Sequence, residues 1–368
     1  MKLLTLFSVI YLLTSVDSFA SLKFNLGQGY SNNISKNKTE HLKGQFLDSD
    51  LSVDTKIQPI NTIATFSFIN RHYKDEVYAD NFDSSVFSFD TISDFLLKQN
   101  TIFIGGIHGE RFDGRGIDFD NNSVLGRDEL YSIYAINGGI TQTHKYEKID
   151  LLFGFDLELG YKRFDTLSND ENGNLFRDDQ DGFTQKVWAL IKNRKGDDVK
   201  VTAFHSKTAF HERRSRFTEG TLDNSRRNPF QELEIWKVSI QYEKKFDFFD
   251  LQFIGESDIQ DDLIFGALDS KQNSLALSFT FDFFDLLILR PSMSFSNRKF
   301  QTFVADLINN PSATEKRKDR SFVQSVNFEV PYKNLRFTIN LQNTKNDSNY
   351  QLEGYHEHSF GFGLGIHF

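Results

Sequence analysis

Two acidic stretches of the chain space their oxygen-bearing side chains as a calcium-binding loop does. The first match, at positions 1, 3, 5 and 12 of such a loop, is Asp118, Asp120, Asn122 and Glu129. A weaker match follows at Asp170, Asn172, Asn174 and Asp181. Neither stretch has glycine at position 6, where a sharp turn normally brings the ligands together. The stretches are therefore either calcium sites or solvated polar loops.

Catalytic patterns are weak in this sequence. His205 and Ser206 are adjacent, so on a strand they point to opposite faces and cannot act as base and nucleophile. His205 and His211 would be about 20 Å apart on an extended strand, which is too far to share a metal ion. The chain contains no Gly-x-Ser-x-Gly elbow, no His-Glu-x-x-His helix and no glycine-rich phosphate loop. We therefore expect no catalytic residue, no metal site and no cofactor.

Basic side chains gather in two places that could bind anions. The first group is Arg213, Arg214, Arg216, Arg226 and Arg227, and the second is Lys316, Arg317, Lys318 and Arg320. Guanidinium groups bind phosphate through paired hydrogen bonds. Three interpretations stay open: contact with phosphate at a lipid surface, an anion-selective rim around a pore, and a plain solvated surface.

Composition limits which elements could position these residues. The chain has 40 Phe and 12 Tyr but only 2 Met and no Cys, which favours β-structure and excludes disulfides, thiol catalysis and Cys-ligated zinc. The mean hydropathy of −0.44, with no apolar run of 18 residues after the N-terminus, argues against a bundle of membrane helices. The net charge of −9 argues against nucleic acid as a partner.

The first twenty residues have the pattern of an export signal. Lys2 precedes the apolar run 3–13, and Ser18-Phe19-Ala20 matches a small-residue cleavage site. We expect residues 1–20 to be a cleaved signal peptide and residues 21–368 to be a single domain. The alternative is an N-terminus that stays anchored in the membrane.

The last nine residues alternate strictly between apolar residues and glycine or histidine. Phe360, Phe362, Leu364, Ile366 and Phe368 would share one face of a strand. With the export signal, this segment resembles the final strand of bacterial outer-membrane β-barrels. The resemblance implies an all-β, transmembrane, antiparallel up-and-down barrel in the outer membrane, and recognition of Phe360 to Phe368 by the barrel-assembly machinery.

The same alternation recurs upstream and predicts which side chains face the lumen. In segment 151–161 the odd positions are apolar, so Asp156 and Glu158 must face the lumen, because carboxylates facing lipid are very costly. The other lumen candidates are Lys162, Lys237, Glu243, Arg336, Thr338, Asn340 and Gln342.

Connection lengths give the strand number. Tight connections are expected near 57–60, 98–100, 145–149, 194–198, 246–249, 284–285 and 333–334. Long polar stretches are expected near 32–42, 72–83, 113–128, 165–182, 213–231, 260–271, 301–319 and 345–353. They imply about sixteen strands with both termini periplasmic, or fourteen, since segment 43–56 alternates poorly. Pro291 cannot donate to a ladder, so we expect a bulge there.

One short motif occurs twice. Phe246-Asp247-Phe248-Phe249-Asp250-Leu251 is repeated as Phe281-Asp282-Phe283-Phe284-Asp285-Leu286. Both copies fall at expected tight turns, where Asp favours the turn and Phe suits an aromatic girdle at a membrane interface. Chance in a Phe-rich chain is the alternative.

The expected function follows from the size of the barrel. Sixteen strands leave an aqueous lumen, which favours a porin-like channel for small polar solutes. By resemblance to general porins, the third long stretch, 113–128, would fold inward as a constriction, and the protein could be a homo-oligomer. Lipopolysaccharide and other outer-membrane lipids would be its surroundings. The alternatives are a non-conducting structural or adhesive barrel and, less favoured, an outer-membrane enzyme.

The chain is also similar to an uncharacterised family of outer-membrane barrels of about this length. The likeness lies in segments 59–66 and 76–79 and in Ser296-Asn297-Arg298-Lys299-Phe300. It implies the same fold and adds no mechanism.

Overall fold

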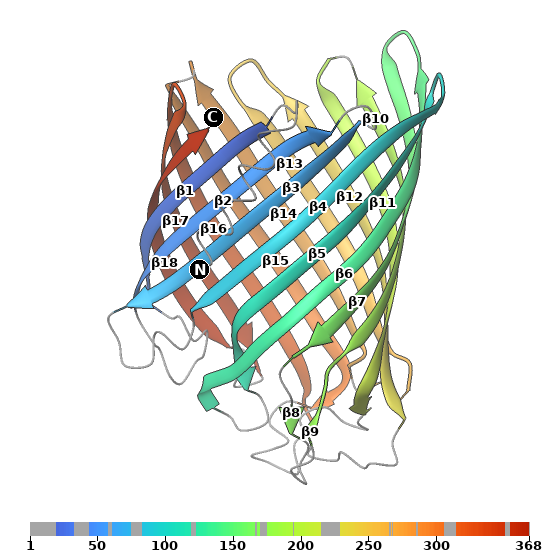
Figure 1. Cartoon of the computed structure of the whole chain (residues 1–368), viewed down its shortest axis with the longest axis vertical. Helices are drawn as coiled ribbons and strands as arrows, with labels where there is room; N and C mark the ends of the chain where they lie inside the picture. The colour runs from blue at the N-terminus through green and yellow to red at the C-terminus, as the bar shows by residue number, and fades with distance from the viewer. Residues whose placement is uncertain are drawn as a thin grey trace.

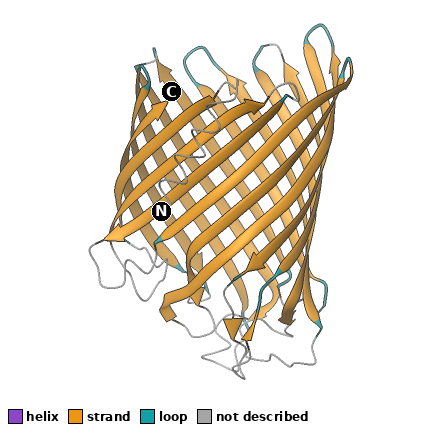
Figure 2. Cartoon of the chain, viewed as in Figure 1, coloured by secondary structure: helices purple, strands orange, loops and turns teal. Residues whose placement is uncertain are grey.

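The computed structural model describes residues 20–32, 44–57, 61–74, 83–118, 123–165, 168–169, 175–193, 195–214, 229–264, 266, 268–284, 286–304, 314–349 and 354–367. Sixteen strands close into one antiparallel barrel (Figures 1 and 2). These strands are β1 (Ala20–Ser31), β2 (Gly44–Ile57), β3 (Thr62–Lys74), β4 (Ser84–Lys98), β5 (Thr101–Asp118), β6 (Ser123–Lys145), β7 (Ile149–Phe164), β10 (Gln180–Asn193), β11 (Asp197–Arg214), β12 (Phe230–Lys245), β13 (Asp250–Asp262), β14 (Ser270–Phe283), β15 (Leu287–Val304), β16 (Lys316–Tyr332), β17 (Leu335–Ser348) and β18 (Tyr355–His367).

Each barrel strand pairs with the strands that precede and follow it in the chain, and β1 closes the barrel against β18. The prediction of sixteen strands is confirmed and the alternative of fourteen is wrong, because the poorly alternating segment 43–56 forms β2. A separate two-stranded sheet, β8 (Ser168–Asn169) with β9 (Leu175–Phe176), lies between β7 and β10. No helix of the described residues is long and apolar enough to cross a membrane.

The connections alternate in length, as the sequence predicts, except that the four residues between β5 and β6 are no longer than a short turn. Short turns join β2 to β3, β4 to β5, β6 to β7, β10 to β11, β12 to β13, β14 to β15 and β16 to β17 at one rim, at the top of Figure 1. The longer connections lie at the opposite rim. Lys23 of β1 pairs with His367 of β18, so the barrel begins and ends at the rim of the short turns.

The expected long stretch at 113–128 is mostly strand, which corrects the prediction. Asp113 pairs with Leu130 and Gly116 with Arg127, so β5 and β6 continue as a hairpin and only residues 119–122 separate them. An inward constriction formed by the whole stretch is therefore wrong. Strand pairing continues here because the backbone ladder does not depend on the alternation of apolar side chains that marks the spans.

Pro291 also departs from the expectation, because no bulge accompanies it. The register between β14 and β15 is the same on both sides of it, with Ser278 opposite Ser292 and Phe281 opposite Leu289. On the other side Pro291 pairs with Val326 of β16. The missing N–H is thus tolerated without an inserted residue. The register shift of β15 lies between Lys299 and Val304 instead.

The outer wall of the barrel is apolar. Directly paired residues lie on the same face of a sheet, so the registers carry the assignment of faces from strand to strand around the barrel. Large apolar side chains on the outward face are about half exposed, as Leu159 (56%), Val238 (52%) and Phe362 (52%) illustrate. Soluble proteins do not leave a continuous apolar band of this kind in water. The outer wall is therefore suited to lipid.

Aromatic side chains gather at the short turns, where both copies of the repeated motif lie. Phe246 stacks on Phe249 with ring centroids 4.4 Å apart, and Phe249 contacts Phe281 at 5.5 Å. Phe248 and Phe284 project from their turns with 70% and 92% of their surface exposed. Exposed aromatic rings at one end of the apolar band have the position of an interfacial girdle.

Candidate functional site

A cavity of about 600 Å³ lies against the inner wall where the first and last strands of the barrel meet. Its polar lining comes from both ends of the chain and includes Asn25, Asp48, Asp50, Arg71, Tyr73, Glu329, Arg336, Thr338, Asn340, Gln342 and Glu357. The lumen positions predicted for β17 are thereby confirmed, because Arg336, Thr338, Asn340 and Gln342 all line this cavity. Barrel closure creates the site, since residues of β1 and β18 are distant in the sequence.

Glycine on the inner face of the last strand makes room for the cavity. Gly361, Gly363 and Gly365 alternate with the outward-facing Phe360 and Phe362, and all three line the cavity. A Cβ atom added at Gly361 would come no closer than 3.6 Å to another atom, which is an ordinary contact. The wall therefore has open space at Gly361 that a larger side chain could enter, whereas a Cβ atom at Gly363 or Gly365 would lie 2.8 or 2.5 Å from the side chain of Thr338 or Asn25.

Replacing Gly361 by tryptophan is expected to narrow the lumen. The indole would extend from β18 into the cavity, and single-channel conductance should fall, since flux depends on the open cross-section of the pore. The matched control is Phe362→Trp, which places the same ring on the lipid face and should leave conductance unchanged. Equal conductance of both variants and the parent would show that solutes do not pass this part of the wall.

One guanidinium in the cavity is held in a fixed position. Arg71 of β3 donates two hydrogen bonds, of 2.6 and 2.7 Å, to Asp48 on the neighbouring strand β2. Its Cζ lies 4.6 Å from the centre of the Phe46 ring, and Nη1 donates to the Tyr73 hydroxyl at 3.4 Å. A paired, stacked guanidinium presents a flat polar surface to the lumen while its charge is balanced.

A second group places two arginines on one carboxylate. Glu329 of β16 accepts from Arg290 of β15 at 2.6 Å and lies 3.2 Å from Arg336 of β17. The Glu329 side chain is only 9% exposed, whereas those of Arg290 and Arg336 are 40% and 48% exposed. One buried negative charge thus faces two positive charges that water in the lumen can reach. These three residues together carry one excess positive charge.

The wall on the other side of the barrel is also charged. Asp156 of β7 lies 3.5 Å from Lys186 of β10 and accepts a hydrogen bond from the Trp188 indole at 3.1 Å. Lys237 of β12 lies 2.8 Å from Glu256 of β13. Asp156 and Lys237 therefore face the lumen, as predicted. Acidic and basic groups neutralise each other along the same wall, because each lies next to a partner on a neighbouring strand.

The remaining lumen candidates agree with this assignment. Lys162 lies 3.7 Å from the centre of the Tyr131 ring on the inward face of β6. Glu243 accepts hydrogen bonds from Gln241 at 2.7 Å and from Gln252 of β13 at 2.8 Å. Glu158 pairs in register with Thr184 on the same inward face. Short-range hydrogen bonds and cation–π contacts thus hold the lumen side chains against the wall.

The calcium hypothesis receives no support from the described residues. Asp120, Asn122, Asp170, Asn172 and Asn174 lie outside them, as do the side chains of Asp118 and Glu129. Asp181 accepts from His211 at 2.9 Å on the outer face. In the part of the chain that the structure describes, no three carboxylate or histidine groups are placed to share a metal ion.

The two basic groups also differ from the expectation. Of the first, Arg216, Arg226 and Arg227 lie outside the described residues, and Arg213 stacks over Phe210 at 5.2 Å. The second group, Lys316 to Arg320, was expected in a loop but forms the start of β16. Strand geometry then separates it: Arg317 faces inward and pairs with Asp319 at 2.8 Å, while Lys318 and Arg320 face outward.

His205 and Ser206 lie on opposite faces, as predicted. His205 faces outward, where it contacts Glu234 at 2.6 Å and stacks on Trp236 at 4.1 Å. Ser206 pairs with Thr184 and Ile235 on the inward face. His205 and His211 are each paired with a different carboxylate, Glu234 and Asp181. Neither a nucleophile and base pair nor a two-histidine site forms here.

Sequence reasoning missed Arg71, Glu329, Arg290 and Trp188 as lumen residues. Their strands alternate less clearly than β7 or β18, because isoleucine also occurs on the inward face, as at Ile63 and Ile69 of β3. In each strand, one charged residue is enough to assign which alternate positions face the lumen, since a charge on the outer wall within the lipid band is very costly.

A closed barrel with an apolar outer wall and a polar inner wall is a transmembrane β-barrel, the one sheet architecture that satisfies every backbone group in a membrane. No protein-family model matches the chain, and no curated protein sequence matches it either. Its similarity to known proteins is found among solved structures.

CdiB from Acinetobacter baumannii aligns with a TM-score of 0.54 and 8% sequence identity, over 94% of this chain and 60% of CdiB. The chain thus spans about three fifths of the length of CdiB. OccAB1 from the same organism aligns with a TM-score of 0.53 and 10% identity, over 96% of this chain and 97% of OccAB1. The chain has the fold of an outer-membrane β-barrel.

Proposed function

We propose that the protein is a porin-like channel of the outer membrane that allows small polar solutes to pass by diffusion. The observation that carries the proposal is the closed sixteen-strand barrel with a polar inner wall that includes a cavity of about 600 Å³. A barrel of this strand number is too wide for its inward side chains to fill, whereas barrels of about eight strands are packed.

The lumen chemistry favours polar solutes of low charge. Most of the charged groups described above are paired with a neighbour on the same wall, so they offer hydrogen-bond donors and acceptors without a strong field. In the group around Glu329, two arginines share one carboxylate. Weak anion preference near that group is the expected selectivity.

The proposal also includes an orientation of the barrel in the outer membrane. With the short turns and both barrel ends on the periplasmic side, the long connections face the outside. Residues 1–20 would be removed as a signal peptide, leaving the barrel of residues 21–368. The alternating strand that ends at Phe368 would be the segment recognised by the barrel-assembly machinery. Outer-membrane lipid and lipopolysaccharide would contact the outer wall, and trimers or other homo-oligomers are compatible with it.

Single-channel conductance of the refolded protein in a planar bilayer tests the proposal. Stepwise currents are expected, and a salt gradient should give a small reversal potential of the sign for anions. A folded protein that shows no steps would contradict the channel and favour a non-conducting structural or adhesive barrel. Catalysis is not part of the proposal, because His205, Ser206 and His211 form no reactive pair.

A further inference from the structure

Three lysines form an unbroken row across the outer face of β14, β15 and β16. Lys271 is directly paired with Lys299, and Lys299 is directly paired with Lys318. All three side chains are exposed. Directly paired residues have Cβ atoms about 4.5–5.5 Å apart, and like charges at that distance destabilise a sheet. The lysine row therefore has an electrostatic cost that a bound anion would remove.

Several other charged side chains on the outer face have an ion-pair partner, in contrast to two of the three lysines. Lys207 lies 2.6 Å from Glu232, Lys345 lies 2.8 Å from Asp347, and Arg111 lies 3.0 Å from Asp165. In the lysine row, Lys318 lies 3.6 Å from the exposed Glu315. For Lys271 and Lys299, no carboxylate of the described residues lies within ion-pair distance.

The height of the lysine row on the barrel points to a lipid headgroup. The row lies toward the rim of the long connections. On each of the same three strands, the outward-facing residue four positions closer to the middle of the barrel is apolar: Leu275, Phe295 and Phe322. Four residues of a tilted strand correspond to about 10 Å along the barrel axis. The lysines therefore lie at the level expected for lipid headgroups, and the apolar side chains lie at the level expected for acyl chains.

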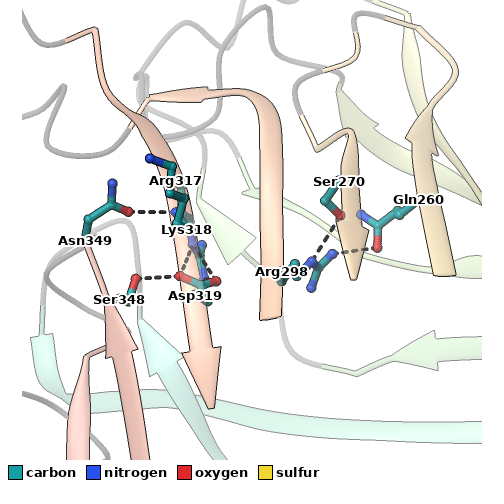
Figure 3. A network of polar contacts seen from close by, with 8 residues as sticks. All are labelled: Gln260, Ser270, Arg298, Arg317, Lys318, Asp319, Ser348 and Asn349. Carbon is teal, nitrogen blue, oxygen red and sulfur yellow. Dashed lines mark hydrogen bonds and ion pairs between the residues drawn. The ribbon is translucent and has the colours of Figure 1, made fainter. Parts of the chain in front are cut away.

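Side chains on the inner face hold this part of the wall together (Figure 3). Arg298, next to Lys299, donates to Ser270 of β14 at 3.0 Å and to Gln260 of β13 at 2.9 Å. Arg317, next to Lys318, pairs with Asp319, which also accepts from Ser348 of β17. These bonds link β13 to β15 and β16 to β17 behind the lysines. A backbone fixed in this way loses little freedom when an anion binds.

We propose that the row Lys271–Lys299–Lys318 is a binding site for the phosphate groups of a phosphorylated glycolipid of the outer leaflet. Arg320 is exposed on the same face, between Asn297 of β15 and Asp347 of β17, and Asp347 lies 2.8 Å from Lys345. A soluble phosphate would need only the lysines, whereas a lipid would also use the apolar side chains below them. The inference rests on the proposed orientation, with the long connections facing outward.

The test compares variants folded in bicelles of zwitterionic lipid, with lipid binding counted by native mass spectrometry. The probe is diphosphorylated lipid A, and dephosphorylated lipid A serves as the reference. The triple variant Lys271→Gln, Lys299→Gln and Lys318→Gln is expected to bind the phosphorylated probe about a hundredfold more weakly, since each basic residue near an anionic surface contributes about a factor of five. The triple Lys→Arg variant should bind nearly as the parent does.

A matched control removes three lysines from the short turns at the other rim. The variant Lys148→Gln, Lys195→Gln and Lys333→Gln has the same change in net charge and should keep full binding. Equal affinity of the two Gln variants would overturn the proposal. So would full competition by inorganic phosphate at the concentration of the lipid, because the site would then be for a free anion. The binding measurement does not depend on ion conductance, so a barrel that fails to conduct could still bind the lipid, and the two proposals can fail separately.

Discussion

Replacing Val238 by arginine is expected to destabilise the folded barrel by about 2–4 kcal/mol, the cost of a basic side chain on the lipid face near the middle of a bilayer. Val238 lies in the middle of β12, is 52% exposed, and pairs with Ala203 and Ser257 on the outward face. The cost arises because the guanidinium must lose its water or distort the bilayer to keep it.

The adjacent residue provides the control. Ser239→Arg introduces the same side chain one position along β12, where it faces the lumen and pairs in register with Thr202 and Glu256. Its free energy of unfolding should stay close to that of the parent. Both can be measured by urea titration in lipid vesicles, with the fluorescence of Trp188 and Trp236 as the signal. Equal losses for the two variants would show that β12 does not separate lipid from water.

Replacing Glu329 by glutamine is expected to shift the ion selectivity of the channel toward anions. The substitution keeps the shape of the side chain but removes the one negative charge that balances Arg290 and Arg336. Even in bulk water, the interaction energy between an unbalanced charge and an ion about 4 Å away is about 1 kcal/mol. This energy corresponds to about a fivefold change in the permeability ratio of anions to cations. The reversal potential in a salt gradient measures this ratio.

Two further variants identify the cause of such a shift. Glu329→Gln combined with Arg336→Gln restores the charge balance, so its reversal potential should return toward that of the parent. Glu315→Gln makes the same change in net charge on an exposed side chain, 68% accessible, at the outer rim, and should have little effect. A Glu329→Gln channel with the selectivity of the parent would mean that ions do not pass close to these arginines.

The sequence predicted the strands whose two faces differ most. In β7, apolar residues at the odd positions and Asp156 and Glu158 at the even positions fix both the strand and its faces, and β18 does the same with phenylalanine and glycine. The short turns were predicted because each is a brief break in the alternating pattern between two such strands. These local signals were enough to give the strand number and the fold.

The sequence could not predict features that depend on partners far along the chain. Glu329 meets Arg290 and Arg336 only because β15, β16 and β17 pair in one particular register. For the hairpin of β5 and β6 beyond Asp113 the sequence predicts a loop, because its charged residues no longer alternate with apolar ones. Outside the lipid band nothing requires that alternation, so the pattern ends before the strand does.

The contact between β1 and β18 also bears on how fast the barrel forms. Ser31 donates to Glu357 at 2.8 Å across this contact, and the two residues are 326 positions apart in the chain. Neighbouring hairpins can form from local contacts, but this pairing requires both ends of the chain to meet, and such distant contacts form slowly. The step that seals the membrane wall is thus the one with the greatest loss of chain entropy. Until it occurs, both edge strands have unpaired backbone groups that could pair with another protein.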